Sequence, residues 1–322
     1  MDKKDLRIIY MGTPDFAVES LKALVEGGYN VVGVVTMPDK PAGRGLKLQY
    51  SPVKEYALSR SLPLLQPEKL KDPQFIAELQ ALKADLQIVV AFRMLPEVVW
   101  DMPCLGTFNL HASLLPQYRG AAPINWAVIN GETETGVTTF FLTHEIDTGK
   151  IIEQEKIPID DNDDAGMVHD RLMLLGAKLV VKTVDRILNG NLDSVAQEDI
   201  LQGKEPKLAP KIFKETCEIN WNDSTKQVYD FIRGLSPYPA AWTELKTPNG
   251  ELLHLKIFET EKHFAKQNNR PGTLVTDGKK IMDVTTNDGF LRLVSIQQAG
   301  KKRMSVADFL RGNRITEADR LI

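Results

Sequence analysis

Cysteines and long apolar runs are scarce in this 322-residue sequence. Its two cysteines, Cys104 and Cys217, are too few for a disulfide framework or a cysteine-based metal site. No stretch approaches the ~20 consecutive apolar residues that a membrane span requires. The short apolar run near the start leads directly into a turn at Gly12, so we interpret it as a strand and not as a secretion signal. We therefore expect a cytoplasmic protein with reduced thiols and no membrane partner.

Three familiar ligand-binding motifs are incomplete in this sequence. Gly12 follows the first apolar segment, but the other glycines of the dinucleotide-binding pattern G-x-G-x-x-G are missing. His144-Glu145 lacks the second histidine of a zinc-binding H-E-x-x-H helix. The acidic run from Asp160 to Asp164 lacks the glycine and the distal glutamate of a calcium loop, and we interpret it as a solvated helix cap. We predict no dinucleotide site and no metal site.

Length and charge favour two domains of different character. Hydrophobic residues make up 43% of the chain and charged residues 26%, as in ordinary folded proteins. Because single cores rarely exceed roughly 250–300 residues, we predict a first domain at 1–203, a linker at 204–215 and a second domain at 216–322. Residues 1–208 hold 22 Lys and Arg against 29 Asp and Glu, whereas residues 209–322 hold 18 against 14. The basic excess favours a polyanionic partner for the second domain.

Apolar strand-like segments alternate with helical segments through the first domain. Continuous apolar runs predict strands at 7–11, 31–35, 62–65, 86–92, 107–111, 137–142 and 150–157. Apolar residues at helical spacing predict helices after the turn at 12–14 and at 53–60, 75–82, 123–129 and 164–188. This alternation predicts a doubly wound, mostly parallel α/β sheet, in which ligands bind beyond the carboxyl ends of the strands.

The pattern changes after the first domain. Proline and charged residues dominate the predicted linker. One helix is expected at 225–234, followed by short strands at 241–245, 252–260, 272–276, 281–285 and 289–296. Turn sequences containing Gly250, Gly278 and Gly289 separate these strands. Five short strands joined by hairpin turns predict a small β-barrel of the oligonucleotide-binding kind.

Two polar segments of the first domain offer catalytic chemistry. Asn109 and His111 stand two residues apart at the end of a predicted strand, so their side chains point to the same face. An amide donor and an imidazole directed at one point can stabilise a developing oxyanion, and histidine can supply a proton near neutral pH. Asp147 precedes a glycine turn and can orient the imidazole. The three groups suit acyl transfer to a substrate amine, which needs no protein nucleophile.

The same segments resemble a known family. Residues 109–128, NLHASLLPQYRGAAPINWAV, resemble the folate-dependent formyltransferase motif, an Asn-x-His followed by Ser-Leu-Leu-Pro. The DTG sequence at Asp147 and the opening RIIYMGTPDFAVESL resemble this family as well. The resemblance implies a Rossmann-like formyltransferase domain followed by a smaller barrel, with 10-formyltetrahydrofolate as a cosubstrate and no tightly bound cofactor. It implies a catalytic trio of Asn109, His111 and Asp147, and a folate site lined by Ser113, Leu114, Leu115 and Pro116.

A basic loop bears on the identity of the acceptor. Residues 37–45, MPDKPAGRG, resemble the glycine-rich loop that reaches the acceptor stem in family members acting on methionyl-tRNA. The resemblance implies that Lys40 and Arg44 contact this RNA and that the barrel domain holds it. The predicted reaction is formylation of the methionyl amino group of initiator methionyl-tRNA, which serves translation initiation. We expect the protein to act as a monomer.

Other interpretations remain open at this point. The acceptor can be a small amine, such as an amino-sugar nucleotide or a glycinamide ribotide, which needs neither the basic loop nor a second basic domain. The same trio fits a formyltetrahydrofolate hydrolase, and a non-catalytic RNA- or folate-binding module would not need the trio at all. Each residue also has a structural interpretation: a lone histidine on a strand is usually structural, Asp147 can be an ordinary turn residue, and Lys40 and Arg44 can be solvated charges.

Overall fold

The computed structural model describes residues 2–42, 47–191, 193–265 and 269–322. The chain forms two compact units, which are described separately. The first unit comprises Met1–Gly120, Thr135–Ile157 and His169–Leu208, and the second comprises Ala121–Glu134, Pro158–Val168 and Ala209–Ile322. The second unit thus includes two segments from the first half of the chain. The domain boundaries given above stay predictions.

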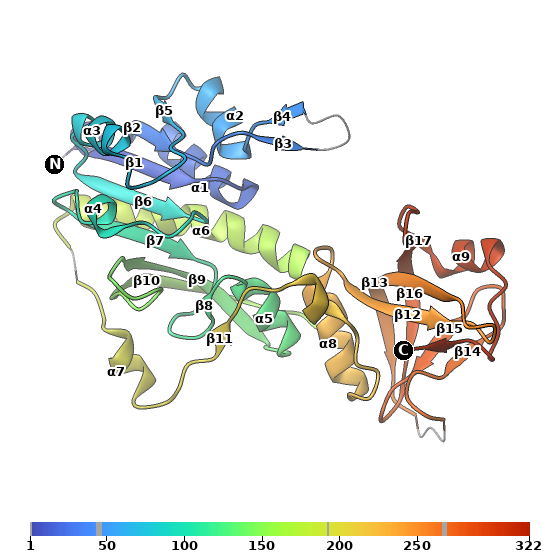
Figure 1. The fold of residues 1–322 in the computed structure, drawn as a ribbon. Coiled ribbons are helices and arrows are strands. Elements are labelled where there is room, and N and C mark those ends of the chain that lie inside the picture. The colour runs from blue at the N-terminus through green and yellow to red at the C-terminus, as the bar shows by residue number, and fades with distance from the viewer. Residues whose placement is uncertain (1, 43–46, 192, 266–268) are drawn as a thin grey trace. The chain divides into compact units, whose positions relative to one another are not determined.

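A seven-stranded sheet forms the centre of the first unit (Figure 1). Its strands are β1 (Arg7–Gly12), β2 (Asn30–Val35), β5 (Leu64–Leu65), β6 (Leu86–Val90), β7 (Thr107–His111), β9 (Glu134–Phe141) and β10 (Ile151–Pro158), in the order β10-β9-β7-β6-β1-β2-β5. Strands β5, β2, β1, β6 and β7 run parallel, whereas β9 is antiparallel to β7. All five residues of β6 are buried, because helices cover both faces of a parallel sheet. The predicted doubly wound α/β fold is confirmed.

Alternate residues of the central strands face different helices. On one face, Ile9 and Val89 join a core cluster with Leu79 of α3 (Pro73–Ala81) and Val99 of α4 (Glu97–Trp100). On the other face lie α1 (Asp15–Glu26) and α6 (Ala165–Leu188). Strand β7 lies so close to α6 that a Cβ on Gly176 would come 2.7 Å from a methyl group of Leu110.

The strand order reverses between β1 and β6. The chain proceeds from β1 outward through β2 to β5, then returns to β6 and β7 on the opposite side of β1. Open α/β sheets bind ligands at the carboxyl ends of the strands where the order reverses, which in this sheet are the ends of β1 and β6. His111 ends β7, the neighbour of β6, and therefore lies at the same edge of the sheet.

Several short elements of the first unit had no counterpart among the predicted elements. They include helix α4, the hairpin β3 (Lys40–Ala42) and β4 (Lys47–Gln49), β8 (Arg119–Gly120) and α7 (Gln197–Leu201). Helix α2 (Pro52–Ser59) was predicted, and Ser51 caps it by accepting a hydrogen bond from the Lys54 N–H. Strand β11 (Leu208–Ala209) pairs with β8, and a 3₁₀ helix covers Lys214–Cys217, so the predicted linker contains regular structure.

An antiparallel sheet closes into a small barrel in the second unit. Its strands are β12 (Ala241–Lys246), β13 (Leu252–His263), β14 (Leu274–Thr276), β15 (Met282–Thr285), β16 (Phe290–Gln298), β17 (Met304–Ser305) and β18 (Arg320–Leu321). The order is β14-β15-β16-β13-β12-β18, with β17 also paired to β16. A bridge between Thr273 and Arg320, with the Leu321 N–H donating to the Gly272 carbonyl at 3.1 Å, links the first and last strands of this order. The predicted barrel is confirmed, and α9 (Val306–Gly312) is an addition to it.

A buried ion pair on α8 (Thr225–Leu235) holds the early segments of the second unit in place. Arg233 Nε donates to Asp230 Oδ1 at 2.7 Å, and its Nη1 donates to the Asp163 carbonyl at 2.7 Å. Helix α5 (Pro123–Ile129) also packs on α8, where Asn125 Nδ2 donates to the Gly234 carbonyl at 2.8 Å. These contacts explain why residues 121–134 and 158–168 belong to this unit.

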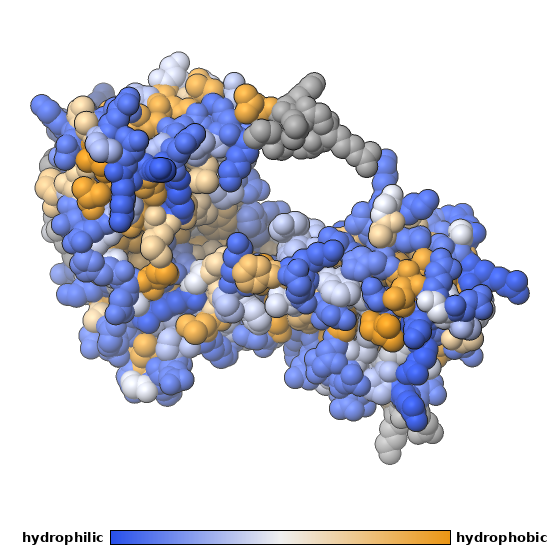
Figure 2. Space-filling model, in the orientation of Figure 1, coloured by the Kyte–Doolittle hydropathy of each residue, from blue (hydrophilic) through white to orange (hydrophobic). Residues whose placement is uncertain are grey.

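The surface of each unit is mainly hydrophilic on the faces that Figure 2 shows, with hydrophobic residues scattered in small groups. Scattered apolar residues are normal on a folded protein. Among the described residues, no helix combines the length and the apolar character that a bilayer crossing requires.

The turn after β14 gives a first test of the barrel. Asp277 Oδ1 accepts hydrogen bonds from the backbone N–H groups of Ile281, Lys280 and Lys279, which lower the pKa of Asp277 to about 2. Because this pKa is below the ordinary Asp value of 3.8, the contribution of these hydrogen bonds to folding stability is present above pH 3.8 and is lost as pH falls towards 2. We expect Asp277→Asn to lower the melting temperature at pH 7, and this difference to shrink below about pH 4.

Thermal unfolding of both proteins from pH 7 to pH 3 checks this expectation. Glu251→Gln, on an exposed turn of the same unit, serves as the control. A melting temperature of Asp277→Asn equal to that of the wild type at pH 7 would show that the turn does not depend on this carboxylate.

Candidate active site

The ring of His111 is fixed by the backbone that follows it. His111 Nε2 lies 2.9 Å from the carbonyl oxygen of Tyr118, and a carbonyl can only accept a hydrogen bond. Nε2 therefore carries the hydrogen, and the neutral ring keeps its lone pair on Nδ1. Nδ1 faces Asp147 Oδ2 at 3.9 Å. Because Nε2 is engaged with the Tyr118 carbonyl, Nδ1 is the ring atom through which His111 can exchange a proton.

Asn109 lies on the same face of β7 as His111, since the two residues are separated by one position of an extended strand. Its Oδ1 atom is buried and has no hydrogen-bond partner among the described residues. A buried polar atom left without a partner costs about 1–3 kcal/mol. Such an atom beside a catalytic-type histidine is expected where a bound ligand supplies the missing partner.

Asp147 is presented by a tight loop between β9 and β10. Its backbone adopts a left-handed conformation with φ of 56°, which Asp tolerates better than most residues. The hydroxyl of Thr148 donates to the Glu145 carbonyl at 3.1 Å and closes the loop. The backbone N–H of Gly120 donates to Asp147 Oδ2 at 3.0 Å. With only 13% of its side chain exposed, the carboxylate is held in one place beside the imidazole.

Gln197 is a further polar residue of this region that the sequence reasoning missed. It begins the short helix α7 and is fully buried. Its Nε2 donates to the carbonyls of Asp147 at 2.9 Å and Gly149 at 2.8 Å. Its Oε1 accepts from Arg119 Nε at 2.9 Å and Nη2 at 2.7 Å. A single glutamine in a polar stretch carries no periodic signal, so only the fold reveals these contacts.

The predicted folate-lining residues form the turn after His111. These are Ser113, Leu114, Leu115 and Pro116, all buried except Leu114, which is half-buried. Ser113 Oγ donates to the Gln117 carbonyl at 2.7 Å. The Leu115 N–H donates to Thr138 Oγ1 at 3.1 Å, and its carbonyl accepts from Gln154 Nε2 at 2.8 Å. These contacts stabilise the turn that presents the Tyr118 carbonyl to His111, and a direct contact with folate stays a prediction.

Of the two predicted RNA-binding residues, the structure describes Lys40, which belongs to a hairpin on the first unit. Lys40 begins β3 with an exposed side chain, and Arg44 lies outside the described residues. Lys54 Nζ contacts Asp39 Oδ2 at 2.5 Å, and Gln66 Nε2 donates to Asp39 Oδ1 at 2.9 Å. These two hydrogen bonds, that of Lys54 being the stronger, hold the pKa of Asp39 below its usual value. Because Asp39 immediately precedes the hairpin, the cluster fixes the point at which the hairpin leaves the sheet.

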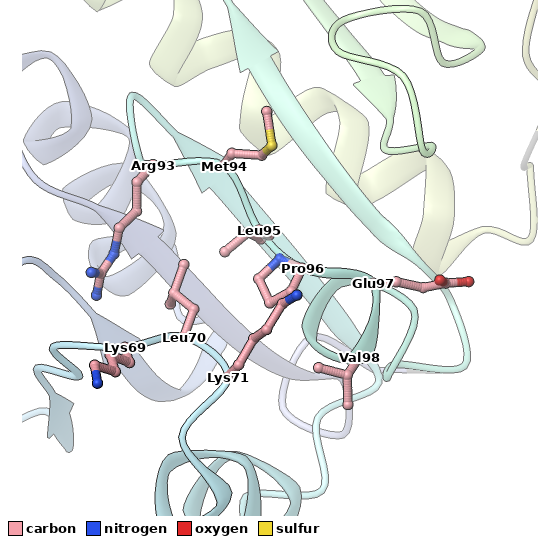
Figure 3. Close-up of a pocket in the computed structure, with 9 residues that line it drawn as sticks. All are labelled: Lys69, Leu70, Lys71, Arg93, Met94, Leu95, Pro96, Glu97 and Val98. Atoms are coloured by element: carbon pink, nitrogen blue, oxygen red, sulfur yellow. The ribbon is translucent and has the colours of Figure 1, made fainter.

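A cavity of about 770 Å³ lies beside the segment that follows β6 (Figure 3). It is lined by Lys69, Leu70, Lys71, Arg93, Met94, Leu95, Pro96, Glu97 and Val98. Figure 3 shows Leu70, Leu95 and Pro96 near the centre, with Lys69 and Arg93 on one side and Glu97 on the other. Arg93 is tied down by hydrogen bonds to the carbonyls of Pro67 and Glu68, and burial lowers its pKa. An apolar floor edged by cations suits a ligand with an aromatic part and an anionic part.

The cavity does not include the trio, but one contact links the two. Glu97 Oε1 lies 3.5 Å from Nε2 of His144, on the loop that carries Asp147. The His144 ring also meets Trp100 of α4 edge-on, with 5.4 Å between ring centroids. Both partners of the ion pair are more than half exposed, so it adds little stability. Its value is geometric, because it shows that the Asp147 loop borders the cavity.

These groups define a class of enzyme. An imidazole with one available nitrogen beside a carboxylate suits general acid–base chemistry. The side-chain N–H₂ of Asn109 is the part of that residue that can donate to an oxyanion, since its unpaired Oδ1 can only accept. The nearby Ser113 hydroxyl is already engaged in a hydrogen bond, so the site favours attack by an external nucleophile. Within the described residues, no three His, Cys, Asp or Glu side chains are placed to hold a metal ion. The fold and the site together are those of an α/β enzyme that transfers an acyl-type group.

Comparison with known proteins identifies the protein family. A family model described as formyl transferase matches residues 6–184, and one described as formyl transferase, C-terminal domain, matches residues 211–314. The chain therefore belongs to the formyl transferase family. A protein named methionyl-tRNA formyltransferase from Bacteroides thetaiotaomicron is 67% identical over 317 residues, which is 98% of each chain. One of the same name from Flavobacterium johnsoniae is 56% identical and covers 95% of this chain and 96% of its own.

Solved structures share the fold at lower identity. An N-formyltransferase from Helicobacter canadensis, in complex with folinic acid and dTDP-3-aminofucose, has a TM-score of 0.63 at 20% identity and covers 91% of this chain and 99% of its own. HypX from Aquifex aeolicus, in complex with tetrahydrofolic acid, has a TM-score of 0.61 at 18% identity and covers 95% of this chain and 47% of its own. At these identities the likeness shows the fold alone.

Gly149 gives a test of the Asp147 loop. A Cβ atom at this position would overlap the carbonyl oxygen of Phe141, so alanine must push the loop away from β9. We expect Gly149→Ala to lower the free energy of unfolding by about 1–3 kcal/mol or more. Urea unfolding measures the change. Gly312→Ala, whose Cβ would meet nothing within 4 Å, is the matched control. Equal stability of Gly149→Ala and the wild type would contradict the close packing of this loop.

Proposed function

We propose that the protein transfers a formyl group from 10-formyltetrahydrofolate to the amino group of initiator methionyl-tRNA. The observation that carries this proposal is the 67% identity, over 98% of both chains, to a curated protein named methionyl-tRNA formyltransferase. The sugar-modifying relative is only 20% identical, so it supports the fold and not the acceptor. The match to the formyl transferase family model supports a formyl donor that is consumed as a cosubstrate.

The chemistry follows from the available atoms of the trio. The methionyl nitrogen attacks the formyl carbon, and the carbonyl oxygen gains negative charge in the tetrahedral intermediate. Asn109 and a protonated His111 are proposed to stabilise that oxygen, with Nδ1 as the donating ring atom. Collapse breaks the bond between the formyl carbon and N10 of the folate, and N10 takes a proton. The attacking amine loses one proton, and Asp147, whose Oδ2 lies 3.9 Å from His111 Nδ1, is proposed to assist its transfer.

The donor site is proposed to be the cavity beside β6. A folate has a flat ring system and an anionic glutamate end. Leu70, Leu95 and Pro96 provide an apolar lining, and the exposed ammonium groups of Lys69 and Lys71 can attract carboxylates. The Asp147 loop borders this cavity through His144 and Glu97. The segment 113–116 is proposed to line the folate site as well as to fix the position of His111.

The RNA acceptor is proposed to contact both the β3–β4 hairpin and the second unit. Lys40 is exposed on the hairpin, and the Asp39–Lys54 ion pair fixes the start of that hairpin. Residues 209–322 carry four more basic than acidic residues, and this positive net charge is expected of a region that binds RNA. We also propose that the protein acts as a monomer in the cytoplasm without a membrane partner, since translation initiation supplies its acceptor there.

Substitution of the trio tests the chemistry. We expect His111→Ala and Asp147→Asn each to reduce kcat by about 10²–10⁴ with the fold intact, because each removes a general acid–base or electrostatic contribution. Formyl transfer to charged initiator tRNA measures kcat, and circular dichroism checks the fold. Cys104→Ala, an exposed thiol outside the site, is the control. Near-normal turnover of His111→Ala would remove the proposed mechanism.

The identity of the acceptor is tested by offering the protein each candidate acceptor separately. The wild-type protein is incubated with the formyl donor and either charged initiator tRNA or free amino sugars. Transfer to the tRNA alone is expected. Transfer to an amino sugar without transfer to tRNA would replace the proposed acceptor with a small amine.

Substitution of Lys40 tests whether the hairpin contributes to tRNA binding. We expect Lys40→Ala to raise KM for tRNA while kcat stays near normal, and to lower the slope of log KM against log salt by about one. Steady-state kinetics across a salt series measure both quantities. Lys22→Ala, on α1 of the same unit, controls for a general loss of positive charge. An unchanged salt slope would assign Lys40 to a solvated position.

A further inference from the structure

Gln197 joins the backbone of Asp147 and of Gly149, two residues later, to the segment that holds the Asp147 carboxylate. We infer that Gln197 is a positioning residue for formyl transfer, acting through Asp147 without touching the substrates. The inference rests on the proposed function, and in particular on the proposed role of Asp147 beside His111.

The side-chain amide of Gln197 uses its donor and its acceptor in different directions. Nε2 donates to the carbonyls of Asp147 and Gly149 at 2.9 and 2.8 Å, so both peptides of the loop are held by one group. Oε1 accepts two hydrogen bonds from the Arg119 guanidinium, at 2.9 and 2.7 Å. The residue after Arg119 is Gly120, whose N–H donates to Asp147 Oδ2 at 3.0 Å. The position of the Asp147 carboxylate is thus fixed both through its own backbone and by the neighbouring segment.

Gln197 is itself held in place by the sheet. Val195 and Ile151 exchange two backbone hydrogen bonds of 2.8 Å, which attach the segment before α7 to the first residue of β10. This bridge places Gln197 next to Gly149, two residues before Ile151. The side chain is fully buried, so water does not compete for its hydrogen bonds. A buried amide with all its partners in place specifies one geometry for the loop that it joins.

The left-handed backbone of Asp147 makes such support necessary. A non-glycine residue at φ of 56° persists only where its surroundings hold it there. Without Gln197, the buried carbonyl of Gly149, the partly buried carbonyl of Asp147 and the Arg119 guanidinium lose these hydrogen bonds, and Asp147 is free to leave His111 Nδ1. A displacement of about 1 Å in a catalytic group can reduce turnover about 10²-fold.

Two variants separate the functions of the amide. Gln197→Leu removes donor and acceptor, whereas Gln197→Glu keeps an acceptor for Arg119 and removes the Nε2 donor. We expect both to reduce kcat by about 10²-fold while KM for the folate and for tRNA changes little. Gln87→Leu is the matched control, since Gln87 is another fully buried glutamine of the same unit and lies on β6. Its kcat should remain within about twofold of the wild type.

A double-mutant cycle with Asp147→Asn provides the decisive measurement. Single-turnover formyl transfer to charged tRNA is measured for the wild type, each single variant and the double variant, after circular dichroism has checked the fold of each. If Gln197 acts through Asp147, adding Gln197→Leu to Asp147→Asn should cost less than about twofold further. A loss equal to that of Gln197→Leu alone, or a normal kcat in both Gln197 variants, would overturn the inference.

Two other results would leave the role of Gln197 decidable. If Gln197→Leu does not fold, the cycle is completed with Gln197→Glu, and the same criteria apply. If the wild type formylates another amine and not tRNA, the proposed acceptor fails, and the cycle run with that amine still decides the role of Gln197.

Discussion

The hydrogen bond between His111 Nε2 and the Tyr118 carbonyl is the constraint on which the rest of the site depends. It fixes the neutral tautomer, leaves Nδ1 as the only ring nitrogen for proton exchange, and directs that atom towards Asp147. The turn between the two residues holds the Tyr118 carbonyl in position for this hydrogen bond. Hydrogen bonds of Ser113 and Leu115 stabilise the turn. The carboxylate is supported by different means, through backbone hydrogen bonds and the buried side chain of Gln197.

The topology of the sheet decides where these groups meet. The order of the parallel strands reverses between β1 and β6, and β7 brings His111 to the same carboxyl edge of the sheet, where such sheets bind ligands. The antiparallel strand β9 then returns the chain, so that the loop before β10 carries Asp147 back to His111. An acyl-transfer site of this kind needs no protein nucleophile, since the fold supplies positioned donors and the substrate supplies the amine.

The sequence predicted what depends on periodicity and missed what depends on tertiary contact. Apolar runs identified β1, β2 and β6, and helical spacing identified α6 within one residue of its start. The strands β17 and β18 have two residues each, too few for a pattern, and α9 follows β17 directly. Asn109, His111 and Asp147 could be selected from spacing and family resemblance. Gln197 could not, because its importance comes from a bridge between Val195 and Ile151 that no local signal announces.

The most direct measurement is the protonation of the His111 ring. Nitrogen-15 NMR of protein labelled in its histidine rings reports which nitrogen carries the hydrogen, and a His111→Gln sample assigns the signal. At a pH where the ring is neutral, the hydrogen is expected on Nε2, with Nδ1 unprotonated. A neutral ring with its hydrogen on Nδ1 would contradict the bond to Tyr118 and the chemistry derived from it.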